Sequence, residues 1–147
     1  MEIREILKRL REERGLLQEE LAERVLVTRQ AVSRWETGQT QPNTDTLRLL
    51  SREFDVSINT LLGMPRQLYC QCCGMPLNED SFISREPDGS FNEDYCKWCY
   101  ANGAFVYTTQ ESLVDFLVAH MPNPEGLPDD QRRALYNGQL AHLKHWQ

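Results

Sequence analysis

The sequence predicts a mainly α protein in two parts: five short helices, then a small cysteine-rich segment with short strands and two C-terminal helices. Apolar residues recur at helical spacing over the first 62 residues, this period stops at Gly63-Met64-Pro65, and four cysteines form two Cys-x-x-Cys pairs further on. We therefore expect a first domain, a linker and a second domain that divides into a ribbon and a helical tail. Their bounds are 1–63, 64–68 and 69–147, the last divided into 69–107 and 108–147.

The helices of the first domain are indicated by their apolar faces and their end signals. Ile3, Ile6, Leu7 and Leu10 recur at i, i+3, i+4 and i+7, and Gly15 is a stop signal. Four more helices follow from similar patterns and from capping residues. They are expected from Gln18 to about Val25, from Thr28 to Gly38, from Pro42-Asn43 to Phe54, and from Ser57 to Leu62.

The second domain has no helical period until about residue 107. Thr108-Thr109-Gln110-Glu111 has the pattern of a capping box and predicts a helix after it. Asp129-Asp130 begin a last predicted helix, which is expected to extend to His142 and His145. The apolar face of the first of these helices would be Leu113, Phe116, Leu117 and Met121.

Charge is divided unevenly between the two domains. The chain has 16 Lys and Arg against 22 Asp and Glu, a formal net charge of −6. Residues 1–66 hold eleven bases and eleven acids, so the remaining residues, with five bases and eleven acids, carry the whole excess. An acidic chain does not coat nucleic acid indiscriminately, but a local DNA-binding face is compatible with this balance.

Several classes of protein are disfavoured by absent patterns. No run approaches 18 uncharged apolar residues, and Met1 to Glu5 alternate charges where a signal peptide would be apolar. We therefore expect no membrane span and a cytoplasmic protein. The sequence does not predict an enzyme, because it has no nucleophile–base set, Gly-rich phosphate loop or zinc-hydrolase pattern.

The tight joint between the second and third predicted helices is typical of a helix-turn-helix. The segments Leu10–Ala22 (LREERGLLQEELA) and Val27–Glu36 (VTRQAVSRWE) resemble the phage-repressor (Xre) family of transcription regulators, and Val56–Leu62 is similar to its closing helix. The resemblance covers residues 4–62. It implies a five-helix, repressor-like domain whose third helix enters the major groove of double-stranded operator DNA.

Carried over by position, the resemblance assigns contacts to phosphates and to bases. Gln18 would bond a phosphate from the N-terminus of the second helix, where the dipole favours an anion, and Asn43 is a second phosphate candidate. The amide of Gln30 suits adenine, and an Arg suits guanine or a phosphate. The expected reading face consists of Thr28, Arg29, Gln30, Ser33 and Arg34.

Other residues of this domain are expected to be structural. Trp35 should be in the core, and Glu36 should pair with an Arg of the first helix, because an acid facing phosphate would repel it. The family commonly has Gly or Asn where this chain has Leu26, and Thr or Ser where it has Leu17. A Leu at positive φ costs about 1 kcal/mol or more, and Leu17 cannot cap a helix. The competing interpretation is a helical bundle whose polar residues are solvated surface.

Cys70-x2-Cys73 and Cys96-x2-Cys99, with 22 residues between them, have the spacing of a four-thiolate structural zinc site. Each pair makes a tight knuckle, and two knuckles close a tetrahedron around one Zn²⁺. Few aliphatic residues surround the cysteines, so metal ligation would replace a core. An iron–sulfur cluster is the competing occupant, and a thioredoxin-like motif is disfavoured because no βαβ pattern surrounds the cysteines.

The segments Tyr69–Leu77, Asp88–Phe105 and Leu143–Trp146 resemble a bacterial zinc-ribbon domain family, and this resemblance implies a metal site more than an activity. Cys72 is interpreted as a small buried filler, with a redox-sensing or metal-exchange thiol as the alternative. His142 and His145 are interpreted as solvated surface, with a second metal pair as the alternative, which the lack of a Cys or carboxylate within one turn disfavours.

Together these observations predict a transcription regulator that works as a homodimer. The reading segment holds only two Arg, so one copy should bind DNA weakly. The acidic zinc-ribbon half suits a protein partner or an effector better than phosphate. A first alternative is a protein-interaction adaptor whose helix-turn-helix only mediates dimerisation, which Leu17 and Leu26 favour. A second is a zinc-thiolate alkyl acceptor, which four closed thiolates disfavour.

Overall fold

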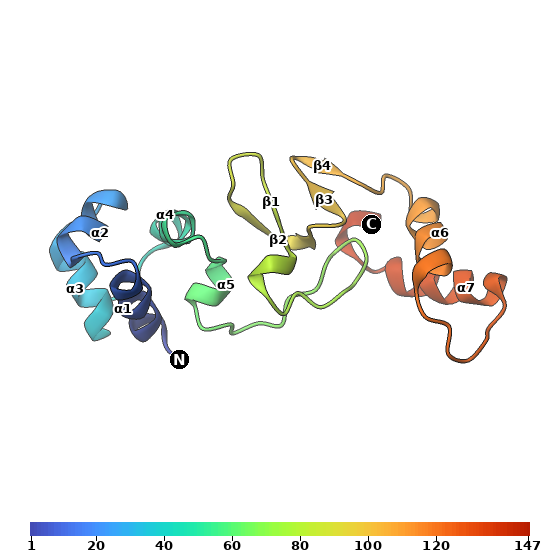
Figure 1. Cartoon of the computed structure of the whole chain (residues 1–147), viewed down its shortest axis with the longest axis horizontal. Coiled ribbons are helices and arrows are strands. Elements are labelled where there is room, and N and C mark those ends of the chain that lie inside the picture. Colours follow the sequence, from blue (N-terminus) through green and yellow to red (C-terminus); the bar gives the residue numbers. More distant parts are fainter. The chain divides into compact units, whose positions relative to one another are not determined.

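The computed structural model describes all 147 residues, which form two compact units. The first unit consists of Met1–Gln67 with Gly89–Phe91, and the second of Leu68–Asp88 and Asn92–Gln147. Figure 1 shows helices at both ends of the chain and strands only in its middle part. The prediction of a mainly α protein with a few short strands is therefore confirmed. A membrane span would need a longer and more apolar helix than any that this chain forms.

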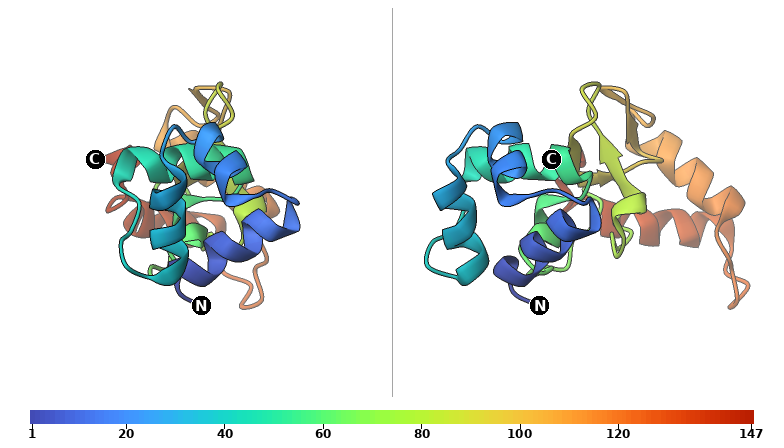
Figure 2. Two further views of the ribbon diagram at one scale, coloured as in Figure 1. Left: turned by 90° about the vertical axis from the view of Figure 1, so that its left-hand side faces the viewer. Right: turned by 60° about the vertical axis from the view of Figure 1, so that its left-hand side comes forward.

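The first unit is helical (Figure 2). Its helices lie close to the ranges that the sequence pattern predicts. Three side-chain caps fix helix starts: the oxygens of Thr28, Asn43 and Ser57 each accept the backbone N–H three residues on, at 2.9 to 3.1 Å. The helices are α1 (Ile3–Glu13), α2 (Gln18–Arg24), α3 (Arg29–Thr37), α4 (Thr44–Phe54) and α5 (Ile58–Leu61).

A single apolar core holds these helices together. Trp35 of α3 is only 5% exposed and lies in this core, as predicted. Because α3 contacts both α1 and α2, the core fixes its inner face and leaves its outer face to solvent. The other residues buried in the core are Leu7, Leu21, Ala22, Val25, Val32, Leu50, Phe54 and Leu61.

The second unit starts with the first cysteine pair and continues through short strands. Strand β1 (Ile83–Arg85) pairs with β2 (Phe91–Cys96), and β3 (Tyr100–Ala101) pairs antiparallel with β4 (Ala104–Phe105), with Tyr100 opposite Phe105. The second cysteine pair connects these sheets, because Cys96 ends β2 and Cys99 precedes β3. A 3₁₀ turn, η1 (Asp80–Phe82), directly precedes β1.

Two packed helices follow, α6 (Gln110–His120) and α7 (Asp129–Leu140). The cap of α6 is Thr109 and not Thr108, because the Thr109 side chain accepts the N–H of Ser112; the predicted helix is present, but the predicted capping box of Thr108 and Glu111 does not form. The buried Arg132 of α7 donates to the carbonyl oxygens of Val118 and Met121 at 2.8 and 3.0 Å. These bonds satisfy carbonyls at the end of α6 that the helix itself leaves unpaired.

The chain ends in a separate 3₁₀ turn, η2 (Lys144–Trp146), because α7 stops at Leu140. His142 and His145 therefore lie beyond the helix that was expected to carry them. His142 is exposed, but the interpretation of His145 as solvated surface was wrong. Its ring stacks on Phe105 with 4.0 Å between centroids, and its Nε2 lies 2.9 Å from the carbonyl oxygen of Tyr107.

Candidate functional site

The helix-turn-helix is made by α2, α3 and the turn between them (Figure 2). Leu26 in this turn has a φ of 61°, and its side chain is 81% exposed. The turn is closed by the N–H of Val27, which donates to the carbonyl oxygen of Ala22 at 3.0 Å. The position that commonly holds Gly or Asn in the family therefore does have a positive φ here, and the turn forms although a Leu in this left-handed conformation costs about 1 kcal/mol.

The predicted reading residues gather at the cap and in the first two turns of α3. Gln30, Ser33 and Arg34 follow the i, i+3, i+4 spacing, so they share one helix face. Thr28, Arg29, Gln30 and Arg34 are exposed, and Ser33 is half-buried. Thr28 uses one lone pair of its hydroxyl oxygen to cap α3, and its O–H can still donate to another group.

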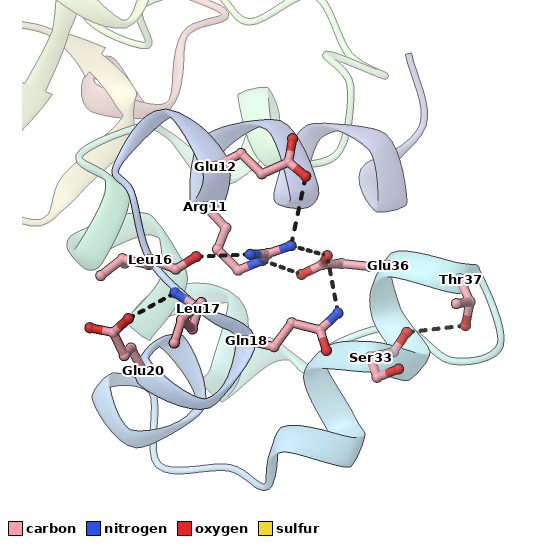
Figure 3. Close-up of polar contacts among 9 residues, drawn as sticks. All are labelled: Arg11, Glu12, Leu16, Leu17, Gln18, Glu20, Ser33, Glu36 and Thr37. Atoms are coloured by element: carbon pink, nitrogen blue, oxygen red, sulfur yellow. Dashed lines mark hydrogen bonds and ion pairs between the residues drawn. The ribbon is translucent and has the colours of Figure 1, made fainter.

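Glu36, near the end of α3, is held by Arg11 of α1 (Figure 3). Arg11 donates from Nε and Nη2 to the two carboxylate oxygens, at 2.8 Å each, and from Nη1 to the carbonyl oxygen of Leu16 at 2.8 Å. The side chains are only 12% and 4% exposed. The prediction that Glu36 pairs with an Arg of the first helix is confirmed, in the strong bidentate geometry.

The same carboxylate orients Gln18, the predicted phosphate ligand. Gln18 Nε2 donates to Glu36 Oε1 at 3.4 Å, which fixes the amide at the N-terminus of α2 (Figure 3). The hydrogen bond with Glu36 raises the pKa of the Arg11 guanidinium, and burial of Arg11 opposes this effect. The acid in this network is therefore neutralised by a permanently charged partner and presents no uncompensated negative charge beside Gln18.

The start of α2 has a partial replacement for its missing cap. Leu17 occupies the N-cap position and has no side chain that can accept a hydrogen bond, as predicted. Its backbone N–H donates to Glu20 Oε1 at 3.0 Å, which is one half of a capping box. Sequence reasoning missed Glu20, although an acid three residues after an N-cap position is the signal that could have found it.

Asn43, the second predicted phosphate ligand, caps α4. Its Oδ1 accepts the N–H of Thr46 at 2.9 Å, and the side chain is otherwise exposed. The amide nitrogen is therefore the part of this side chain that is free to donate to a phosphate.

The sulfurs of Cys70, Cys73, Cys96 and Cys99 converge in the second unit, all within 4.8 Å of one another. Cys73 Sγ and Cys96 Sγ are 3.9 Å apart. A tetrahedral Zn²⁺ with Zn–S bonds of about 2.3 Å separates its sulfurs by about 3.8 Å, so the arrangement fits one zinc ion. A cluster of several irons would hold its cysteine sulfurs farther apart, so the observed 3.9 Å between Cys73 Sγ and Cys96 Sγ disfavours an iron–sulfur cluster.

Hydrogen bonds to sulfur prepare the first knuckle for a metal. The backbone N–H groups of Cys72 and Cys73 both donate to Cys70 Sγ at 3.4 Å, which stabilises a thiolate there. Hydrogen bonds from the neighbouring thiols, first that of Cys73, lower the pKa of Cys70, whereas bonds to Cys70 and its neighbours raise the pKa of Cys99. Four crowded sulfurs cannot all ionise against their mutual repulsion, and a divalent cation removes that obstacle.

The C-terminal 3₁₀ turn η2 is hydrogen-bonded to the first cysteine knuckle. Trp146 Nε1 donates to the carbonyl oxygen of Cys72 at 2.7 Å, and the backbone N–H of His145 donates to that of Gln71 at 3.0 Å. Sequence reasoning missed this support; a partly buried Trp that needs an acceptor was the only signal. Cys72 itself is fully buried and lies outside the four-sulfur group, as expected of a filler.

Comparison with known families agrees with these two sites. Residues 69–147, more than half of the chain, match the family described as "Putative zinc ribbon domain", and residues 7–61 match the helix-turn-helix family. The chain therefore belongs to the zinc ribbon domain family and carries an Xre-type helix-turn-helix domain at its N-terminus.

The related proteins are transcription regulators, not enzymes. The HTH-type transcriptional activator BcrR of Enterococcus faecalis is 45% identical over 63 residues, which are 43% of this chain and 31% of BcrR. The chain thus spans about a third of the length of that relative.

Two solved structures are also similar. The P22 c2 repressor in complex with synthetic operator 9T is 31% identical, with a TM-score of 0.41, over 42% of this chain and 94% of that one. A transcriptional regulator from Listeria innocua is 31% identical, with a TM-score of 0.43, over 46% of this chain and 64% of that one. Both TM-scores are below 0.5, so the family match, and not these structures, defines the N-terminal domain.

Proposed function

We propose that this chain is a sequence-specific, DNA-binding transcription regulator. Residues 1–63 are its DNA-binding domain, residues 64–68 its linker, and residues 69–147 its zinc-ribbon domain. The observation that carries the proposal is the helix-turn-helix of α2 and α3, in which a matched family pattern coincides with exposed polar side chains on the outer face of α3.

The reading residues have distinct roles in this proposal. Gln30 and Arg34 share a helix face and donate to base edges, where an amide suits adenine and a guanidinium suits guanine. Arg29 and Thr28 at the start of α3 lie where base edges and phosphates meet, and Ser33 completes the face. Gln18 donates to a phosphate from the N-terminus of α2, and its anchor on Glu36 sets the direction of that bond.

The regulator acts as a homodimer. The outer face of α3 has only Arg29 and Arg34 as cations, so few phosphates are neutralised by one copy and one copy binds weakly. Two copies related by a two-fold axis would read half-sites about 10 bp apart, which multiplies the contacts without any new residue.

Cys70, Cys73, Cys96 and Cys99 hold one structural zinc ion, which supplies the cross-link that the small apolar content of the ribbon cannot. The zinc-ribbon domain also carries the acidic excess of the chain, so its outer surface is suited to protein or effector contacts.

The test is selection of bound sequences from a random duplex library with the zinc-loaded chain at about 100 mM salt, at which the sequence-independent contribution of phosphate contacts to affinity is moderate. Enrichment of a palindrome with half-sites one helical turn apart is expected. Gln30→Ala and Arg34→Ala should each weaken binding to the selected site by about 1–3 kcal/mol and relax the preference at single positions. Arg9→Ala on α1 is the matched control and should leave the selected sequence unchanged.

Loss of selection would favour a different class of function. The exposed Leu17 and Leu26 at the two ends of α2 are apolar surface that suits a protein contact. If no sequence is enriched and the three variants bind DNA as the original chain does, the helix-turn-helix is a dimerisation module of an adaptor.

A further inference from the structure

The second unit contains a cavity of about 830 Å³ between the cysteine knuckles and the two C-terminal helices. Trp98 and Cys99 of the second knuckle line one side, and Phe116 and Leu117 of α6 and Tyr136 of α7 line the other. Pockets that bind small molecules commonly measure about 300–1,000 Å³. The cavity is therefore large enough for a small organic molecule that touches both the ribbon and the helices.

The walls of this cavity are apolar and rich in aromatic rings. Phe116, Met121 and Trp98 keep 39, 40 and 51% of their surface in solvent although they are large apolar side chains. The ring of Tyr107 packs beside that of Phe116, with centroids 5.9 Å apart, so the aromatic surface is continuous. A flat aromatic molecule would cover this surface and remove it from water.

The polar groups of the lining define the charge of the occupant. Besides the cysteines, they are the hydroxyls of Tyr107 and Tyr136 and the amide of Gln139, and no Lys, Arg, His, Asp or Glu side chain lines the wall. Two cations lie near the wall without lining it: Arg132 is hydrogen-bonded to the end of α6, and Lys97 Nζ lies 4.9 Å from the centroid of the Trp98 ring. Nothing in the wall could compensate a buried anion, whereas a few neutral groups can orient an uncharged molecule.

The cysteines strengthen this argument. Cys73, Cys96 and Cys99 belong to the lining, so three of the four proposed zinc ligands face the cavity. One Zn²⁺ with four thiolates has a formal charge of −2, and the unit is acidic as well. Both effects repel a negatively charged occupant.

We propose that this cavity is a binding site for a small aromatic molecule that carries no negative charge. The molecule lies between the second knuckle and the α6–α7 pair, and binding it stabilises the zinc-loaded unit by mass action. This site does not include any residue of the DNA-reading face, and the proposal does not depend on the proposed regulation of transcription.

The test compares two fluorescent probes that differ by one charge. N-phenylnaphthylamine is neutral, and anilinonaphthalene sulfonate adds a sulfonate to nearly the same rings. With the full zinc-loaded chain, the neutral probe should bind saturably at one molecule per chain, with blue-shifted emission and a raised melting temperature of the zinc-loaded unit. The sulfonate should bind at least about tenfold more weakly, because its charge has no partner in the cavity.

Variants locate the site. Phe116→Arg places a charge in the wall and Leu117→Trp fills the volume without a charge, so each should weaken the neutral probe by about tenfold or more. Leu135→Arg is the matched control: Leu135 is 52% exposed on α7 and does not line this cavity, so binding should change less than about twofold. Zinc content and circular dichroism establish that each variant is folded, and Leu117→Trp decides if Phe116→Arg does not fold.

Three results would overturn the proposal. They are the absence of saturable binding by the original chain, an equal loss of binding in Leu117→Trp and Leu135→Arg, and binding of the sulfonate as tight as that of the neutral probe. DNA selection by the same preparations is unaffected by any of these results, so failure of the cavity and failure of the proposed regulator remain distinguishable.

Discussion

Replacing Glu36 by Gln tests how much of the first unit depends on the buried ion pair between α1 and α3. Gln keeps the size of the side chain but removes the charge that compensates Arg11, whose side chain is 12% exposed. Removing one partner of such a pair costs about 3–5 kcal/mol. A unit of this size has a total stability of roughly 0.05–0.15 kcal/mol per residue, so this loss is a large part of it. The unfolding midpoint should fall by about 12 °C or more.

The matched control is the more exposed pair of Arg24 and Glu53, whose side chains are 52 and 24% exposed and whose N–O distance is 2.6 Å. Glu53→Gln should cost less than about 1 kcal/mol, because solvent screens that pair. Thermal unfolding of the zinc-loaded chain, followed by far-ultraviolet circular dichroism, measures both. Replacing Arg11 and Glu36 together by Met should restore most of the stability, because no buried charge is then left unpaired. The reasoning is refuted if Glu36→Gln lowers the midpoint no more than Glu53→Gln does.

Three further predictions concern the turn, the knuckle and the metal. Leu26→Gly should raise the free energy of unfolding by about 0.5 kcal/mol, because the relief of left-handed strain exceeds the cost of the added chain entropy and the exposed side chain loses no packing. Chemical denaturation measures this free energy, and a destabilised variant would contradict the prediction. Trp146→Phe should speed zinc release to a chromophoric chelator, because it loses the hydrogen bond to the Cys72 carbonyl, which is worth about 1 kcal/mol. Trp98→Phe should leave the release rate unchanged, and equal rates in the two variants would contradict a role of the Trp146 bond in holding the metal. A strong chelator should melt the second unit, α6 and α7 included, while the first 63 residues keep their helicity, and an unchanged melting curve would disprove this dependence on zinc.

The sequence was informative where the structure depends on local rules. Caps such as Thr28 and Ser57 and the stop at Gly38 are read from neighbouring residues, so the helices of the first unit were predicted closely. Glu36 was predicted correctly from charge alone, since an acid on a helix that approaches phosphate needs a cation. The convergence of the four cysteine sulfurs followed from their spacing, because a Cys-x-x-Cys turn aims two sulfurs the same way.

The sequence failed where a partner is distant along the chain. Nothing in the neighbourhood of His145 shows that its ring would stack on Phe105, 40 residues earlier, or that α7 would stop at Leu140 to allow it. The cavity is of the same kind: periodicity identified Phe116 and Met121 as an apolar face, but could not show that the ribbon would cover this face only in part. Periodicity shows which face of a helix is apolar, whereas its partner is decided by tertiary packing.

The bond from Trp146 to Cys72 has a consequence for the order in which the chain folds. It joins residues 74 positions apart, and closing a loop of that length costs chain entropy before any contact repays it. The first unit is made of short helices joined by short turns, whose contacts are mostly local and form quickly. The helix-turn-helix should therefore fold before the hydrogen bond between Trp146 and Cys72 forms, and the zinc-ribbon domain should be the slower-folding of the two domains.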